Sequence, residues 1–228
     1  MHRYTKKFVK YCEETFKIEG SEMQAYQSMS ICILDCVYSL RTKYYSVTLP
    51  IVERYAAKYM NGNVYAPDDN ITRFINNIDT VGGPKAFADM VVKNHQQLGG
   101  KSHIPKEEVC YQLAKYLQLL HINTIEDFQN FGSQELLESV IRAVKGMGDA
   151  GTNYLFMLAG DSDRCKPDVH IRRCIIDACG VDVSNEEECQ ELFTDAVSCL
   201  QRKYPSLTVR ILDGIVWRYY QKKSARGK

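Results

Sequence analysis

The sequence contains no long apolar run, which excludes a membrane-spanning helix. Such a helix needs roughly 20 consecutive apolar residues, whereas this 228-residue chain mixes 45% hydrophobic with 25% charged residues. The N-terminal segment MHRYTKKFVKYCEE also lacks the apolar centre and the small-residue cleavage site of a secretory signal. We therefore expect a cytoplasmic protein that has no membrane partner.

Metal-binding and disulfide spacings are also missing. The chain has nine cysteines, an odd number, and no CxxC pair, so neither a zinc site nor a secreted disulfide framework is indicated. Cys32 and Cys36 lie four residues apart on an apolar stripe, where thiols usually serve as small core residues. We expect reduced, structural cysteines, no metal and no other cofactor.

A strong net charge is absent as well. The formal net charge is +1, so the overall charge does not indicate a nucleic-acid partner. Residues 174–200 carry acids and no bases, and the tail from Arg218 onward carries bases and no acids. Both segments are typical of solvated surfaces, although the basic tail could contact phosphates.

Apolar residues recur at steps of three and four along most of the chain, which predicts helices. The stripes cover residues 29–40, 45–56, 109–120, 137–144 and 212–219, and a further helix is expected over residues 6–16. Ser21-x-x-Gln24 and Ser184-x-x-Glu187 predict helix starts as capping boxes, and Pro105 fits a first helical turn. No alternating stretch with flanking hairpin turns occurs, so a sheet is not expected. The pattern predicts an all-α protein.

Gly146-Met147-Gly148 separates a helix that ends at Val144 from a second apolar helix over roughly residues 150–158. Two glycines permit backbone angles that other residues avoid and let a phosphate come close. The second helix offers unpaired N–H groups and the positive end of its dipole to an anion. With Met147 in the core, the turn would form a small phosphate clamp. The alternative is an ordinary glycine-terminated helix.

Asp168 follows Pro167 where a new helix should begin. Taken alone, this position favours a structural N-cap, because Asp is a preferred capping residue.

Together the two segments resemble the helix-hairpin-helix DNA glycosylases (the HhH-GPD superfamily). VKGMG (residues 144–148) is similar to the family's Leu-Pro-Gly-Val-Gly-like hairpin, with Lys145 in place of the usual proline. PDVHI (residues 167–171) is similar to its Val-Asp-Thr-His-Val-like segment. The resemblance implies that Asp168 is the catalytic carboxylate and that the partner is double-stranded DNA.

The resemblance also implies what this chain lacks. Bifunctional members carry a lyase lysine two residues after the second hairpin glycine, where this chain has Ala150, 18 residues before Asp168. The cysteines do not match the spacing of the family's iron–sulfur cluster. We therefore expect a monofunctional enzyme without a cluster.

A second segment, YSLRTKYYSV (residues 38–47), looks like the family's Leu-Ser-x-Gln-x-Thr stretch. Arg41 falls where many relatives place a Gln that enters the gap left by a flipped base, and a solvated surface charge is the alternative. Tyr44, Tyr45 and Tyr154, with Tyr111, are candidate contacts to the base, with core packing as their alternative. Alkylated purines, mismatched bases and hypermodified pyrimidines all stay open as substrates.

The fold that the resemblance implies has two helical lobes and a monomeric chain. One lobe, of the six-helix type, covers about residues 28–145, with the hairpin at residues 133–160. The other combines the N-terminal helix, about residues 3–27, with residues 168–228. Asp168 would lie in the cleft between them.

The expected function is the hydrolysis of the N-glycosidic bond of a flipped base, in base excision repair or in defence against foreign DNA. The hairpin, Ala150 included, would hold the DNA backbone, and Lys145, Arg172 and Arg173 would contact phosphates. His170 is expected to support the structure. The alternatives are a non-catalytic helix-hairpin-helix DNA-binding protein and a helical interaction scaffold.

Overall fold

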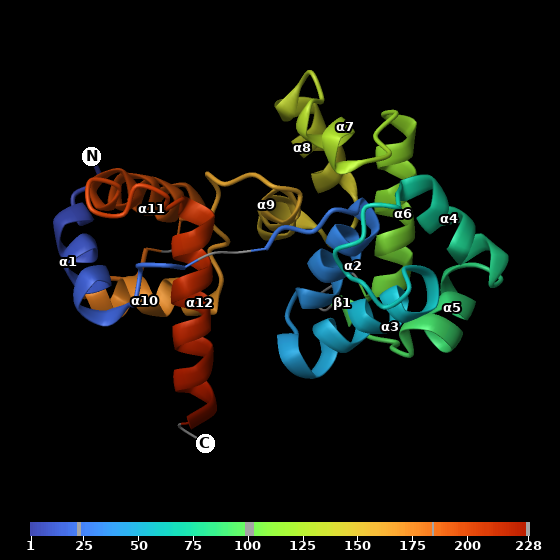
Figure 1. Cartoon of the computed structure of the whole chain (residues 1–228), viewed down its shortest axis with the longest axis horizontal. Helices are drawn as coiled ribbons and strands as arrows, with labels where there is room; N and C mark the ends of the chain where they lie inside the picture. The colour runs from blue at the N-terminus through green and yellow to red at the C-terminus, as the bar shows by residue number, and fades with distance from the viewer. Residues whose placement is uncertain (22–23, 99–102, 184, 227–228) are drawn as a thin grey trace. The chain divides into compact units, whose positions relative to one another are not determined.

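The computed structural model describes residues 1–21, 24–98, 103–183 and 185–226 (Figure 1). Helices make up 64% of it, with twelve α-helices in the described residues, so the all-α prediction is confirmed. No described helix combines the length and the apolar character needed to cross a bilayer. The chain divides into a terminal unit, residues 1–24 with 161–228, and a central unit, residues 25–160.

The terminal unit joins the two ends of the chain in one bundle. Its helices are α1 (Thr5–Thr15), α10 (Val169–Cys179), α11 (Glu186–Leu200) and α12 (Val209–Arg226). α10 and α11 each pack against both α1 and α12, and Figure 1 shows these four helices together. The core is apolar: the rings of Phe8 and Phe193, both fully buried, lie 5.0 Å apart.

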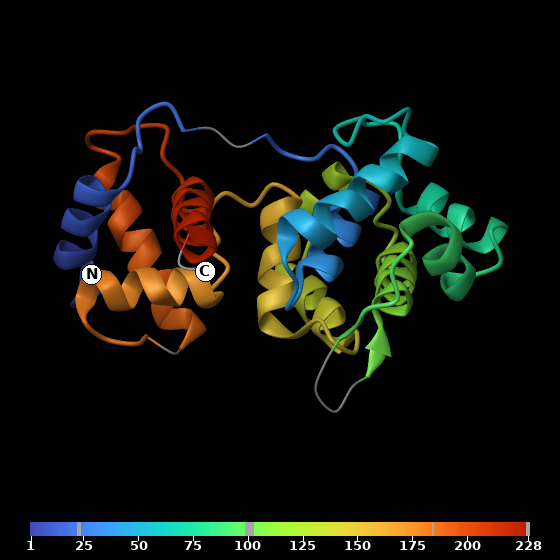
Figure 2. The ribbon, with the colours of Figure 1, turned by 90° about the horizontal axis from the view of Figure 1, so that it is seen from below.

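The central unit is built around one buried helix. Its helical elements are α2 (Met29–Ser39), the π-helical turn η1 (Tyr44–Thr48), α3 (Leu49–Tyr59), α4 (Ile71–Thr80), α5 (Pro84–Phe87), the π-helical turn η2 (Ala88–Val92), α6 (Lys106–Leu119), α7 (Ile125–Gln129), α8 (Gln134–Ala143) and α9 (Gly148–Leu158). Ten of the eleven residues of α2 are buried. It contacts α3, α4, α6 and α9, and Figure 2 shows it flanked by α9 and α6.

The cysteines are free thiols, and eight of the nine are buried. Cys32 and Cys36 are core residues of α2, as the apolar stripe predicts. The Cys36 thiol donates to the carbonyl of Gly151 at 3.2 Å, which joins α2 to α9. Among the described residues, no group of three or more His, Cys, Asp and Glu side chains is arranged to hold a metal ion.

The local helix-start signals were less accurate than the periodicity. No helix follows Ser21: residues 24–28 are not helical, and residues 22–23 lie outside the described part. α2 begins only at Met29, where the buried apolar face begins, because burial stabilises a helix more than a capping motif does. The second predicted box starts at Ser184, outside the described residues. There α11 begins at Glu186, and the side chain of Asn185 is its cap.

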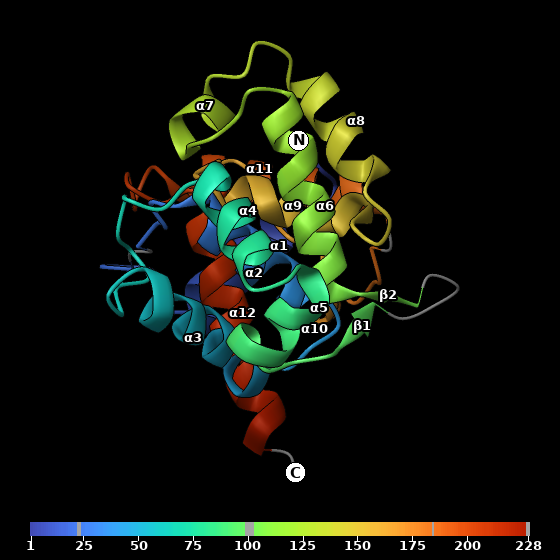
Figure 3. The same ribbon diagram turned by 90° about the vertical axis from the view of Figure 1, so that its right-hand side faces the viewer.

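A small β-ribbon corrects the expectation that no sheet occurs. β1 (Gln97–Leu98) and β2 (Ile104–Pro105) pair antiparallel (Figure 3). Each strand has two residues, too few to show an alternating pattern in the sequence. Pro105 consequently ends a strand and precedes α6 instead of lying in its first turn.

Candidate nucleic-acid interface and catalytic carboxylate

The hairpin between α8 and α9 needs glycine at one position more strongly than at the other. Gly146 has φ +102° and Gly148 has φ +55°, and both angles are unfavourable for L side chains. A Cβ atom on Gly146 would lie 2.5 Å from Cδ1 of Leu98, whereas one on Gly148 would meet nothing within 4 Å. Backbone angle and close approach therefore both select glycine at 146, and only the backbone angle does so at 148.

The hairpin turn is anchored in the core on one side and exposed on the other. Val144 and Met147 are buried in the central core, which confirms the predicted place of Met147. Lys145, Gly146 and Gly148 are exposed. The Met147 N–H donates to the Val144 carbonyl at 3.1 Å. The first N–H groups of α9 have no acceptor within the helix, so the exposed side of the turn suits an anion.

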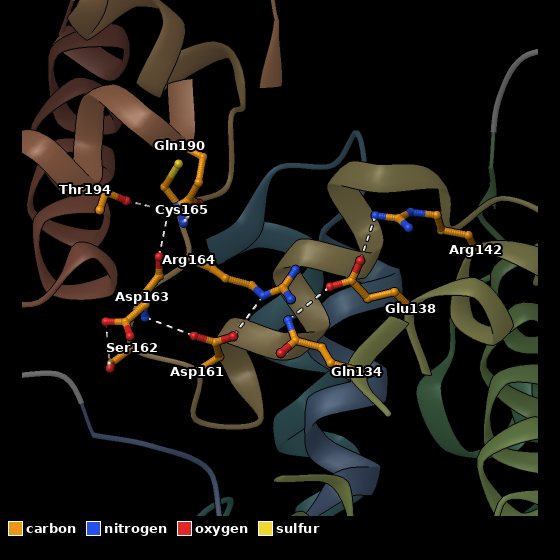
Figure 4. A network of polar contacts seen from close by, with 10 residues as sticks. All are labelled: Gln134, Glu138, Arg142, Asp161, Ser162, Asp163, Arg164, Cys165, Gln190 and Thr194. Atoms are coloured by element: carbon orange, nitrogen blue, oxygen red, sulfur yellow. Dashed lines mark hydrogen bonds and ion pairs between the residues drawn. The ribbon is translucent and has the colours of Figure 1, made fainter. Parts of the chain in front are cut away.

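Charged side chains around the turn change how well it suits an anion. Asp149, which the sequence reasoning did not weigh, lies in the first turn of α9 and repels an anion there. Nε of Arg142 pairs with Oδ1 of Asp149 at 2.6 Å. Its Nη2 pairs with Glu138 at 3.0 Å (Figure 4). This pairing offsets the charge of Asp149. Lys145 adds an exposed cation, and Ala150 is half-buried.

Asp168 is the N-cap of α10. Its Oδ1 accepts the N–H groups of His170 and Ile171 at 2.8 and 3.1 Å, as the structural interpretation of this residue predicts. Both hydrogen bonds end on the same oxygen, so capping the helix does not use Oδ2. The side chain is half-buried. The residue therefore has a fixed carboxylate with one oxygen outside the cap.

A polar network from α11 holds the segment that leads to Asp168. The side chain of Gln190 accepts the Cys165 N–H at 2.9 Å and donates to the Asp163 carbonyl at 2.6 Å, and it also contacts Thr194 (Figure 4). No local sequence pattern indicated Gln190, because it lies 25 residues from Cys165.

The first two turns of α12 also bind this segment. The N–H of Arg210 donates to the Ser162 carbonyl at 3.0 Å, and the Asp213 carboxyl accepts the Lys166 N–H at 3.0 Å. Asp213 is 7% exposed. Burial, with a smaller contribution from the Asp168 charge, raises the pKa of Asp213 to about 8. Sequence reasoning missed this buried carboxyl beside the candidate catalytic one.

The arginines after Asp168 take different positions. Nε of Arg172 lies 3.4 Å from the Pro167 carbonyl, and the residue is half-buried. Arg173 is exposed and donates to Ser224 at 3.2 Å. Of the two, Arg173 is therefore the one on the surface.

Two of the four tyrosines proposed for the base bind one carboxylate. The hydroxyls of Tyr44 and Tyr154 donate to Asp35 at 2.8 and 2.9 Å, and Tyr26 donates to it at 2.8 Å. Burial, then the Asp35 charge, raise the pKa of all three tyrosines. They are therefore neutral donors. A lone acid inside the apolar run of residues 31–38 was the signal for this cluster.

The remaining aromatic candidates lie elsewhere. Tyr45 is 50% exposed, and its ring stands perpendicular to that of Tyr44 at 5.5 Å. The Tyr111 hydroxyl donates to Asp79 at 2.7 Å and is not bonded to Asp35.

Arg41 occupies a constrained loop at the end of α2. It is exposed and has φ +56°, a left-handed backbone that is uncommon for a non-glycine residue. Nζ of the buried Lys106 fixes the loop by donating to the carbonyls of Tyr38 and Leu40, each at 3.0 Å, and to Thr42 at 2.6 Å. The sequence predicted the loop residue but not this lysine, which lies 66 residues from Leu40.

A family model described as a domain of unknown function (DUF8548) matches residues 6–221. The chain belongs to the DUF8548 family. The match includes the hairpin of the central unit, and Asp168 and Asp213 of the terminal unit. No curated protein and no solved structure matches it.

Proposed function

We propose that this DUF8548 protein is a cytoplasmic, monofunctional DNA glycosylase with the HhH-GPD fold, acting on double-stranded DNA. The proposal depends on the geometry of the Asp168 carboxylate. Its carboxylate is fixed by two backbone N–H groups on Oδ1, whereas Oδ2 takes no part in the cap. Such a carboxylate suits electrostatic catalysis, because it is already in position and does not have to move as charge develops in the reaction.

The hairpin supports a DNA partner. Its exposed backbone at Gly146 and Gly148, the start of α9 and the exposed Lys145 suit a phosphate. In the proposed complex they hold the DNA backbone while the target nucleotide is turned out of the stack, which costs a few kcal/mol. Arg173 adds a phosphate contact, and Arg41 enters the gap that the flipped base leaves.

In the proposed reaction the bond between C1′ of the sugar and the base nitrogen breaks, and its electron pair leaves with the base. Positive charge develops on the sugar, as in glycoside hydrolysis, and Oδ2 of Asp168 stabilises it. Water then adds to C1′ and gives a proton to Asp168. Tyr44 and Tyr154, as neutral donors, are the proposed contacts to the base. Ala150 has no amine to form a Schiff base, so strand cleavage does not follow.

The test is a panel of duplexes carrying alkylated purines, mismatched bases or hypermodified pyrimidines, followed by alkali to cut abasic sites. The wild type should cut at least one of them, and only after alkali. Asp168→Asn, which keeps a capping oxygen, should bind that duplex with unchanged affinity and release base at least about a thousandfold more slowly.

Asp182→Asn is the matched control, because Asp182 is an exposed carboxylate of the same unit; it should behave as wild type. Cutting without alkali would contradict the monofunctional assignment. An Asp168→Asn variant as active as wild type would contradict the proposal.

A non-catalytic DNA-binding protein is the second candidate, because the two cap hydrogen bonds alone give Asp168 a structural role. It predicts salt-dependent binding without release of any base. In both cases Lys145→Ala should lower the slope of log affinity against log salt by about 1, whereas Lys58→Ala, an exposed lysine on α3, should not. A helical scaffold without a nucleic-acid role predicts no gel shift at low salt.

A further inference from the structure

One face of α12 lies along the segment that carries Asp168. Arg210, Asp213 and Trp217 follow one another at steps of three and four residues, so they share this face. The backbone N–H of Arg210 donates to the Ser162 carbonyl, and the side-chain carboxyl of Asp213 accepts the Lys166 N–H. The third packs its ring perpendicular to His170, two residues after Asp168, at 6.0 Å.

Asp213 differs from an ordinary structural acceptor. It is a nearly buried carboxyl that accepts a hydrogen bond from a backbone N–H only two residues before a second carboxylate. Burial disfavours the charged form of the Asp213 carboxyl, and the charge of Asp168 adds a smaller contribution of the same sign. The titratable groups around Asp213 are Cys165, Lys166 and Asp168 on the preceding segment and Arg210 on its own helix.

The surroundings of the two carboxyls differ. Asp168 accepts two backbone N–H groups at a helix start and is half-buried. Asp213 accepts one N–H and is nearly buried, and burial raises its pKa to about 8. Near pH 7 most of the Asp213 carboxyl is therefore protonated.

We propose that Asp213 is a positioning residue for Asp168: its buried carboxyl, in the neutral form, accepts the Lys166 N–H and fixes the turn before Asp168. This inference rests on the proposed glycosylase function for its catalytic consequence. The geometry of the turn and the proton on Asp213 are properties of the free protein.

The first arm of the test measures the titration of Asp213 by NMR and needs no enzyme activity. The side-chain carboxyl carbons of ¹³C-labelled aspartate are followed by NMR from pH 3 to pH 10, and the Asp213 signal is identified by its loss in Asp213→Asn. It should titrate near pH 8 in the wild type and at lower pH in Asp168→Asn, which lacks the neighbouring charge. A signal that titrates near 4, the value of an unperturbed Asp, overturns the inference.

The second arm is the pH profile of base release on a duplex that the wild type cuts. Between pH 7 and pH 9 the wild-type rate should fall about tenfold. At pH 9 only about a tenth of a carboxyl with a pKa near 8 keeps its proton, and the ionised Asp213 repels the Asp168 carboxylate from its position. Asp213→Asn, which keeps an accepting oxygen and cannot ionise, should match the wild-type rate at pH 7 and lose this fall. Identical profiles for the two proteins overturn the inference.

Asp213→Leu tests the hydrogen bond to Lys166 separately from the proton on Asp213. It removes the acceptor for the Lys166 N–H, so kcat should fall at least tenfold at every pH while DNA affinity stays within about twofold. Far-UV circular dichroism shows whether this variant folds, and if it does not, the Asn variant carries the test. An absence of base release in the wild type overturns the proposed function alone, and the NMR arm still decides whether Asp213 holds the proton.

Discussion

The hairpin and the turn before Asp168 are both short segments that precede a helix, but they are stabilised differently. The hairpin is held by apolar burial of Val144 and Met147 and by the backbone freedom of Gly146. The turn before Asp168 is held by side chains of other helices, mainly Gln190 and Asp213. The hairpin depends on residues close together in the sequence and on the apolar volume that they bury. The second depends on hydrogen bonds between distant residues, so the two should respond differently to substitution.

The largest effect is expected where apolar burial is removed from the hairpin. Met147→Ala should lower the free energy of unfolding by about 2–5 kcal/mol, because it leaves a cavity in the central core. Urea unfolding followed by far-UV circular dichroism measures it. Met90→Ala is the matched control, since Met90 is 52% exposed, and should change stability by less than about 0.5 kcal/mol. Equal effects of the two substitutions would show that apolar packing does not hold the hairpin.

A smaller effect should separate the two hairpin glycines. Gly146→Ala forces a side chain into φ +102° and against Leu98, which should cost about 1–3 kcal/mol. Gly148→Ala has open space and φ +55°, and the left-handed angle should cost about 1 kcal/mol. Thermal unfolding ranks the two variants. A larger loss in Gly148→Ala would contradict the role assigned to close packing at Gly146.

Removal of one polar contact of the Asp168 turn should have a still smaller effect. Gln190→Leu leaves the Cys165 N–H and the Asp163 carbonyl without their partner, which should cost about 1–2 kcal/mol. Gln190→Glu keeps the acceptor for Cys165 and should lose less. The readout is the fluorescence of Trp217, the only tryptophan of the chain, which lies in the same unit. A Leu variant as stable as wild type would mean that α11 does not hold this turn.

The smallest effect is a pH dependence of stability that comes from Asp213 and not from the hairpin. Asp213 has a pKa of about 8 in the folded protein and about 4 in the unfolded chain, so between these values the folded state binds more protons. Stability therefore falls as the pH rises, by about 1 kcal/mol between pH 7 and pH 9 for this group. Unfolding monitored through Trp217 should show the fall, and Asp213→Asn should remove it. A fall of the same size in the Asn variant would assign it to other groups.

The local sequence around the hairpin predicted its structure closely. The first helix was expected to end at Val144 and ends at Ala143, and the second was expected from about residue 150 and begins at Gly148. The burial of Met147 was also predicted. These features depend on glycine angles and apolar spacing, which are readable over a few residues.

The Asp168 site was predictable only in part. The cap on α10 follows from Asp after Pro at a helix start. Gln190 and Asp213 were not found, because each contacts a segment that lies 25 or more residues away. Lys106 was missed for the same reason, whereas Asp35 had a local signal that was not used: a single acid in an apolar run.

The sequence by itself determined the helical class, the glycine-bent turn and the capping role of Asp168, because periodicity, glycine angles and helix caps act within one or two helical turns. Tertiary structure alone decided which carboxyl lies beside Asp168, which lysine fixes the Arg41 loop and which tyrosines meet at Asp35. Those contacts form only when helices pack, and the burial that comes with packing is what gives the Asp213 carboxyl its raised pKa.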